Sequence, residues 1–158
     1  MNLKRISSPL GPLTLGESDG ALVCVTFGTM PEAGEDSGPN PILTQAEHEL
    51  EEYFAGRRTA FSVPMNPAGT PFQRKVWAAL CQIPYGETIS YGELARRIGS
   101  PKAARAVGMA NHRNSIPILI PCHRVIGANG ALVGYSDGLE IKSFLLNLER
   151  HESTAFHQ

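Results

Sequence analysis

The chain has 158 residues, of which 42% are hydrophobic and 18% are charged, and its formal net charge is −1. These values are typical of a globular protein that is large enough for one sizeable core or two small ones. The N-terminus has no apolar signal region, and no run reaches the roughly 18 apolar residues of a membrane span. We therefore expect a cytoplasmic protein with no membrane partner.

Cysteine, histidine and glycine spacings exclude several kinds of site. Cys24, Cys81 and Cys122 are odd in number and widely spaced, which argues against a disulfide framework and a thiolate zinc site. The histidines form no metal-ligand spacing with them. No Gly-x-Gly occurs, so a dinucleotide fingerprint is absent. We expect neither a metal nor a cofactor.

The charge is unevenly distributed along the chain. Residues 1–71 carry four Lys/Arg against nine Asp/Glu, whereas residues 72–125 carry eight against two. A basic segment of this kind is expected of a face that binds a polyanion. The alternative is a solvated surface that happens to be basic.

The N-terminal third predicts a small sheet and one helix. Residues 13–15 and 21–27 are β-prone, and the sequence GESDG between them predicts a hairpin. Residues 30–42 are polar and rich in Pro and Gly, which predicts a loop. A T-x-x-E capping box then predicts a helix over 44–54.

Three helix starts follow in succession, at residues 70–71 (Thr-Pro), 90–93 (Ser-Tyr-Gly-Glu) and 100–101 (Ser-Pro). The second helix should end near Gly99 and the third near Ala110. Two short helices joined by a Gly-containing turn are typical of a helix-turn-helix.

The third of these helices, which starts at residues 100–101, has an unusual surface for a helix that binds DNA. Arg105 lies among Ala103, Ala104 and Ala106, whereas major-groove helices usually carry several long polar side chains. Small residues allow a close approach to the minor groove, with one arginine available to insert.

These elements predict an α+β fold with two domains. Residues 1–68 would form an N-terminal sheet domain with one helix. Residues 69–150 would form a mostly helical domain with the helix-turn-helix and the active site, ending in an amphipathic helix over 139–150. Residues 151–158 would form a flexible tail.

The sequence IPILIPCHRVIGANG, residues 116–130, contains the candidate nucleophile. Its apolar run predicts a strand that leads into Cys122, and the adjacent His123 and Arg124 are of the kind that lowers a thiol pKa. Adjacent residues of a strand point to opposite sides, so either the chain bends at Pro121 or a water relays the proton. Glu149 is an available carboxylate to orient the imidazole.

Two classes of function remain open on these residues alone. One is a Cys/His hydrolase or peptidase, and the other is a DNA-binding protein that uses its thiol on a base. The helix-turn-helix and the basic segment favour the second. For Cys24 and Cys81 we expect the common role of a small core residue.

Three neighbouring segments carry a resemblance to a known family: IPYGETISYGELARRIGSPKAARAVGMANHRNSIPILI, PCHRVIGANG and GYSDGLEIKSFLLNLE. Together they closely resemble the O6-alkylguanine-DNA alkyltransferases. The resemblance runs from about residue 70 to 149. It implies a ribonuclease-H-like N-terminal domain and repair by transfer of an alkyl group from O6 of guanine, in duplex DNA, to the protein itself in a single turnover. The alternative is a sensor or regulator that binds alkylated DNA without repair. A monomer is implied, with cooperative binding to DNA left open.

The resemblance also implies roles for individual residues. Cys122 would accept the alkyl group, His123 would deprotonate it through a water, and Glu149 would orient His123. Asn114 would fix the active-site turn. Tyr91 would donate a proton to the departing guanine and crowd the DNA backbone.

Further residues are implied at the DNA and around the base. Arg105 would fill the gap left by the flipped base. The other implied contacts with DNA are Ala103, Ala104, Tyr91 and Arg124, and the implied pocket residues are Val125, Tyr135, Ser136 and Lys142. Plain structural roles stay open: Tyr91 and Tyr135 as core tyrosines, Asn114 as a turn residue and Lys142 as a solvated residue.

Two positions depart from the family pattern. Ser115 stands where proline is usual, and Asp137 stands where glycine is usual. We predict that Asp137→Gly speeds the reaction with large O6 adducts, and unchanged rates with both methyl and benzyl adducts would contradict this.

Overall fold

The computed structural model describes residues 1–128, 130 and 138–150. They divide into two compact units, one of residues 1–68 and 115–117 and the other of residues 69–114 and those from 118 onward. The fold is α+β, as predicted. Among the described residues, no helix has the length and apolar character needed to cross a membrane.

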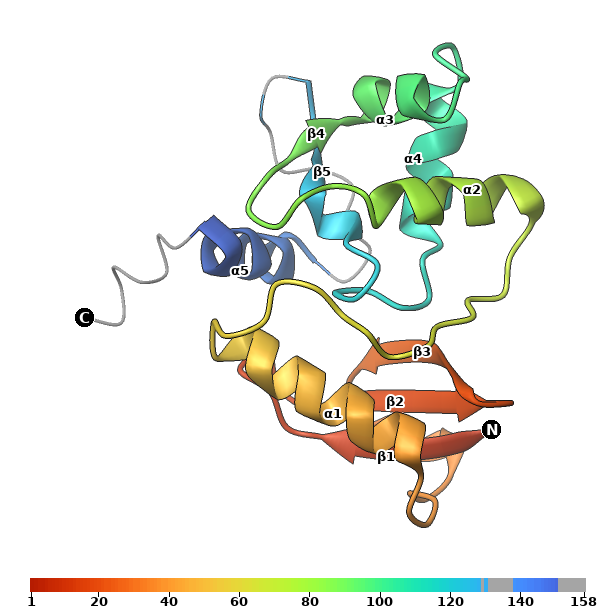
Figure 1. Ribbon diagram of the computed structural model, residues 1–158, viewed down its shortest axis with the longest axis vertical. Coiled ribbons are helices and arrows are strands. Elements are labelled where there is room, and N and C mark those ends of the chain that lie inside the picture. Colours follow the sequence, from red (N-terminus) through yellow and green to blue (C-terminus); the bar gives the residue numbers. More distant parts are fainter. Residues whose placement is uncertain (129, 131–137, 151–158) are drawn as a thin grey trace. The chain divides into compact units, whose positions relative to one another are not determined.

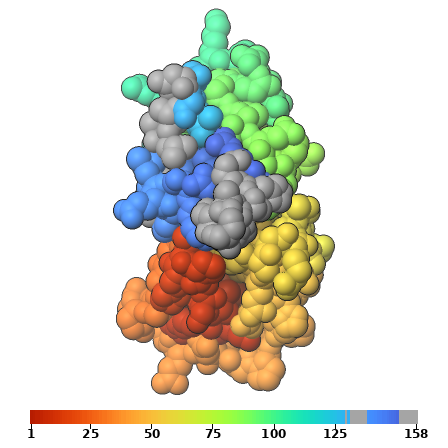
Figure 2. All heavy atoms as spheres, turned by 90° about the vertical axis from the view of Figure 1, so that its left-hand side faces the viewer, coloured from red at the N-terminus to blue at the C-terminus, as the bar shows by residue number. Residues whose placement is uncertain are grey.

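The first unit contains a three-stranded antiparallel sheet in the order β1-β2-β3 (Figure 1). Strand β1 spans Asn2–Ile6, β2 spans Leu13–Ser18 and β3 spans Ala21–Phe27. Strand β1 was not predicted, because its two buried residues, Leu3 and Ile6, do not alternate with period two. It lies at the sheet edge, and red atoms from this end of the chain are visible at the surface in Figure 2.

The predicted hairpin between β2 and β3 is confirmed. Asp19 and Gly20 have φ of 53° and 82°, the two positive values that a type I′ turn requires. The Gly20 N–H donates to Glu17 Oε2 at 2.8 Å, which closes the turn.

Helix α1, Pro41–Phe54, packs on the sheet (Figure 1) and begins three residues before the predicted start. The Asn40 side chain accepts a hydrogen bond from the Leu43 N–H at 3.0 Å, and Pro41 occupies the first helical position. Asparagine followed by proline is a strong start signal, so Thr44 lies inside the helix. The preceding loop contains one short 3₁₀ turn, Pro31–Ala33.

The second unit holds four α-helices, a 3₁₀ helix and two short parallel strands among its described residues. These are α2 Pro71–Leu80, β4 Ile89–Ser90, α3 Tyr91–Arg97, α4 Ala104–His112, η2 Cys122–Arg124, β5 Val125–Ile126 and α5 Leu139–Arg150. The core includes Trp77, whose indole N–H donates to the Ala110 carbonyl at 2.8 Å and so joins α2 to α4. Helices α3 and α4, the pair predicted as a helix-turn-helix, pack against each other, and α2 contacts both of them (Figure 1).

The caps of these helices differ in how closely they follow the prediction. Thr70 and Gln73 form a full capping box at α2. Ser90 accepts from the Glu93 N–H at 3.1 Å, but the Glu93 carboxylate pairs with arginines on its own helix, so only half of that predicted box forms. Helix α4 begins at Ala104 rather than Pro101, because residues 100–103 close a separate turn.

The apolar run before Cys122 is a buried turn and not the predicted strand. Ser115 belongs to the first unit, where its carbonyl accepts from the Val25 N–H at 2.9 Å and its hydroxyl donates to the Val23 carbonyl at 3.2 Å. Ile118 then has a positive φ of 76°, a rare conformation for a β-branched residue. This reversal replaces the extended strand.

Candidate active site and DNA-binding face

The turn that presents Cys122 is held by backbone and side-chain hydrogen bonds. Asn114 Nδ2 donates to the Ile120 carbonyl at 2.8 Å, and the Cys122 N–H donates to the same carbonyl at 2.8 Å. Cys122 is the first residue of η2, so the chain bends at Pro121, one of the two arrangements left open by the sequence. The thiol is buried, with 6% of the residue exposed.

His123 lies next to the thiol in the chain and is fully buried. Its Nε2 is 2.7 Å from Oε2 of Glu149, the carboxylate that the resemblance predicts to orient the ring. Its Nδ1 has no hydrogen-bond partner in the part of the chain that the structure describes. Burial lowers the pKa of His123 below its ordinary value, against the opposing effect of Glu149, so the ring is neutral at pH 7. An ionised Glu149 accepts the Nε2 proton, and Nδ1 is then the free base.

Arg124 is buried, with 6% of the residue exposed. Its guanidinium donates to both Glu149 oxygens, at 2.8 and 3.0 Å, and to the Ile83 carbonyl at 2.6 Å. This placement contradicts the predicted contact between Arg124 and DNA. Burial alone would raise the pKa of Glu149, but hydrogen bonds from His123 and Arg124 and the charge of Arg124 hold it well below its usual range. Arg124 therefore keeps Glu149 ionised.

Lys142 is buried rather than solvated. Its Nζ donates to the Val125 carbonyl at 2.5 Å, which brings α5 to β5. Burial lowers the pKa of Lys142 to about 8, while the nearby Cys122 opposes this shift. A lysine this close to the thiol favours its ionised form.

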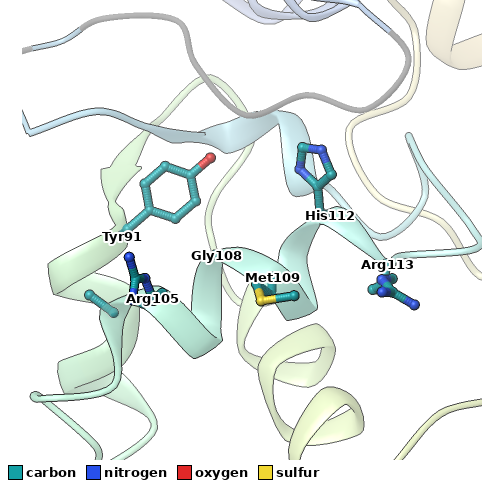
Figure 3. Close-up of a pocket in the computed structure, with 7 residues that line it drawn as sticks. Tyr91, Arg105, Gly108, Met109, His112 and Arg113 are labelled. Carbon is teal, nitrogen blue, oxygen red and sulfur yellow. The ribbon is translucent and has the colours of Figure 1, made fainter.

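Tyr91 begins α3, and its ring lies against α4 at Gly108 (Figure 3). A Cβ on Gly108 would come within 3.7 Å of the Tyr91 ring. Burial raises the pKa of Tyr91, the nearby Cys122 raises it further, and a hydrogen bond from the Asn111 side chain lowers it in part. Sequence reasoning missed Asn111, because a polar residue on a short helix gives no signal of whether it faces the core.

The exposed side of α4 borders a hollow of about 710 Å³. Figure 3 shows Arg105, Gly108, Met109 and His112 following one another along this helix. The lining residues are Tyr91, Ala104, Arg105, Gly108, Met109, His112 and Arg113. Arg105 is exposed, and no ion pair or hydrogen bond engages it among the described residues. The predicted Ala103 is half-buried at the N-cap of α4.

The remaining predicted residues have varied outcomes. Cys24 is only half-buried and Cys81 is exposed, so the expected core role is wrong for Cys81. Tyr135, Ser136 and Asp137 lie outside the described residues. Within the described ranges, no three His, Cys, Asp or Glu side chains cluster in a way that could hold a metal ion.

Sequence profiles of two domains match the chain. Residues 3–67 match the ribonuclease-like domain of 6-O-methylguanine DNA methyltransferase, and residues 71–151 match its DNA binding domain. The chain belongs to this family. This assignment confirms the resemblance to the O6-alkylguanine-DNA alkyltransferases that the residues around Cys122 indicated.

Relatives and solved structures support the family assignment along most of the chain. A methylated-DNA–protein-cysteine methyltransferase of Methanosarcina acetivorans is 50% identical over 90% of this chain and 94% of its own. The constitutive enzyme of that name from Bacillus subtilis is 60% identical over 70% of this chain and 67% of its own. The crystal structure of Mycobacterium tuberculosis OGT in complex with DNA is 47% identical, covers 95% of this chain and 93% of its own, and has a TM-score of 0.85.

Proposed function

We propose that this methyltransferase-family protein repairs DNA by moving the alkyl group from O6 of guanine to the Cys122 sulfur. The observation that carries the proposal is the buried arrangement of Cys122, His123 and Glu149, with His123 Nε2 held at 2.7 Å from the carboxylate. Family membership and the DNA-bound relative from M. tuberculosis support DNA as the partner.

The proton transfers follow from the ionisation of the site. Ionised Glu149 fixes the neutral tautomer of His123, whose Nδ1 takes the thiol proton through one water. The thiolate sulfur then forms a bond to the alkyl carbon, and the bond from that carbon to O6 breaks with its electrons left on guanine. Tyr91 donates a proton to a ring nitrogen, so that guanine leaves as a neutral base.

Base extrusion gives the thiol access to O6. A guanine stacked in a duplex hides this atom, and extrusion costs a few kcal/mol of unstacking. The α4 surface combines small residues with an exposed Arg105, which suits entry into the minor groove and replacement of the extruded base. The basic composition of residues 72–125 supports contact with phosphates.

The reaction consumes the protein, because the product is a stable thioether at Cys122. One alkyl group should therefore be transferred per molecule. We expect a monomer to carry out the transfer, and sedimentation with and without duplex would detect any larger species.

The test is intact-protein mass spectrometry after incubation with a duplex that contains one O6-methylguanine, alongside Cys122→Ala. We expect one added methyl group, mapped to the Cys122 peptide and absent from the variant. Tight binding without a mass change would instead indicate a sensor of alkylated DNA. Neither binding nor methylation would favour the hydrolase interpretation.

A further inference from the structure

Asn111 is a buried polar residue whose side-chain amide makes hydrogen bonds through its nitrogen but not through its oxygen among the described residues. It lies on the inner side of α4 and is 2% exposed. Its Nδ2 donates to the Cys122 carbonyl at 3.4 Å, a long hydrogen bond. Its Oδ1 has no hydrogen-bond partner among the described residues. A buried acceptor left without a partner costs about 1–3 kcal/mol, so this amide does not serve stability well.

The orientation of the amide is set by its neighbours. Reversing it would place Oδ1 against the Cys122 carbonyl oxygen, with two acceptors facing each other. With Nδ2 on that side, the amide also donates a hydrogen bond to the Tyr91 hydroxyl. The amide group therefore joins the backbone of the nucleophile to the side chain of the proposed proton donor.

The Tyr91 ring is held against the same helix one turn earlier. Gly108 leaves room for the ring, since a Cβ there would already lie 3.7 Å from it. Figure 3 shows the ring standing over α4 with its hydroxyl directed away from the helix axis. Helix α4 thus contacts Tyr91 twice, by packing at Gly108 and by hydrogen bonding at Asn111.

We propose that Asn111 is a positioning residue that fixes the Tyr91 hydroxyl as a hydrogen-bond donor toward the departing guanine. A hydroxyl that accepts from the Asn111 amide must direct its own proton elsewhere. The inference rests on the proposed function. The acceptor on guanine is then the ring nitrogen N3, which has a free lone pair and lies across the six-membered ring from C6, whose oxygen carries the alkyl carbon that the thiolate attacks.

The experiment measures single-turnover methyl transfer by Asn111→Leu, which keeps the side-chain shape but removes the donor. Wild type and Tyr91→Phe are compared, and Asn147→Leu is the matched control because Asn147 is exposed on α5. The substrates are duplexes with O6-methylguanine or with O6-methyl-3-deazaguanine, which carries C–H in place of N3. Thermal midpoints are measured for every variant.

We expect Asn111→Leu to slow transfer from O6-methylguanine about tenfold, the equivalent of one hydrogen bond, without lowering the thermal midpoint. With the 3-deaza substrate the variant and the wild type should react at equal rates. In the Tyr91→Phe background the Asn111 change should add no further loss.

Equal losses on both substrates, or a full tenfold further loss in the double variant, would overturn the proposal. A loss of rate that follows a loss of thermal stability would assign Asn111 a purely structural role, and so would also overturn it. Methylation of Cys122 in the wild type reports the proposed function separately, so failure of one idea is distinguishable from failure of the other.

Discussion

Replacing Glu149 with glutamine separates the two tasks of its carboxylate. Glu149 accepts from His123 at 2.7 Å and from Arg124 at 2.8 and 3.0 Å, and it is 2% exposed. Glutamine keeps the shape but has no charge, so Arg124 remains buried without a counterion. His123 also loses the anion that orients it and supports its basicity.

The expected magnitudes follow from burial. Removing one partner of a buried ion pair costs about 3–5 kcal/mol, and we expect roughly 3 because the glutamine oxygen can still accept one hydrogen bond. For a chain of this size, that cost corresponds to a thermal midpoint lower by roughly 6–12 °C. A positioned general base contributes about 10²–10⁴ in rate, so methyl transfer should slow at least a hundredfold.

The assay combines urea unfolding with single-turnover transfer at a temperature where both proteins are folded. Glu93→Gln is the control, because Glu93 pairs with Arg96 and Arg97 on an exposed surface of the same unit. Its unfolding midpoint should stay at the wild-type value. The reasoning is refuted if Glu149→Gln is as stable as Glu93→Gln, or if it transfers methyl at the wild-type rate.

Three other predictions concern pH and salt. The pKa of Glu149 is lowered on folding, so the ionised carboxylate contributes its full stabilisation above the unfolded pKa of about 4.3 and loses it as pH falls toward the lower folded pKa. The difference in unfolding free energy between wild type and Glu149→Gln should therefore be constant from pH 6 to 8 and shrink below about pH 4. The pKa of Lys142 is lowered to about 8 in the folded protein, so the unfolded chain binds more protons than the folded one above that pH. The unfolding free energy of the wild type should therefore rise from about pH 8 toward the unfolded pKa of about 10.4. Lys142→Met should flatten this rise in urea titrations, and an unchanged slope would contradict the burial argument. Arg113→Ala, which changes an exposed residue of the α4 hollow, should reduce the slope of log K against log salt for duplex binding by about one, whereas a phosphate-independent role would leave the slope intact.

Local signals predicted much of the framework. The Thr70–Pro71 start of α2, the hairpin between β2 and β3 and the last helix were all found where the sequence placed them. These features depend on capping, turn chemistry and periodicity, which act over a few residues. Where two local signals competed, as at Asn40 and Thr44, sequence reasoning chose the wrong start for α1.

The nucleophile and its neighbours in the chain were also evident from the sequence. Cys122 and His123 are adjacent, and the PCHRV motif is specific enough to indicate the family. The sequence also suggested Glu149, 26 residues after His123, but only as an available carboxylate. Its contact at 2.7 Å depends on how α5 packs against η2.

Only the tertiary structure decided which polar residues are buried. Arg124 was expected at DNA but lies inside against Glu149, Lys142 could have been solvated but is enclosed, and Asn111 gave no signal at all. The apolar run before Cys122 had the composition of a strand, yet the positive φ of Ile118 makes it a turn. A charged side chain has the same sequence letter at the surface and in the core, and only partners from distant segments determine whether its burial can be compensated.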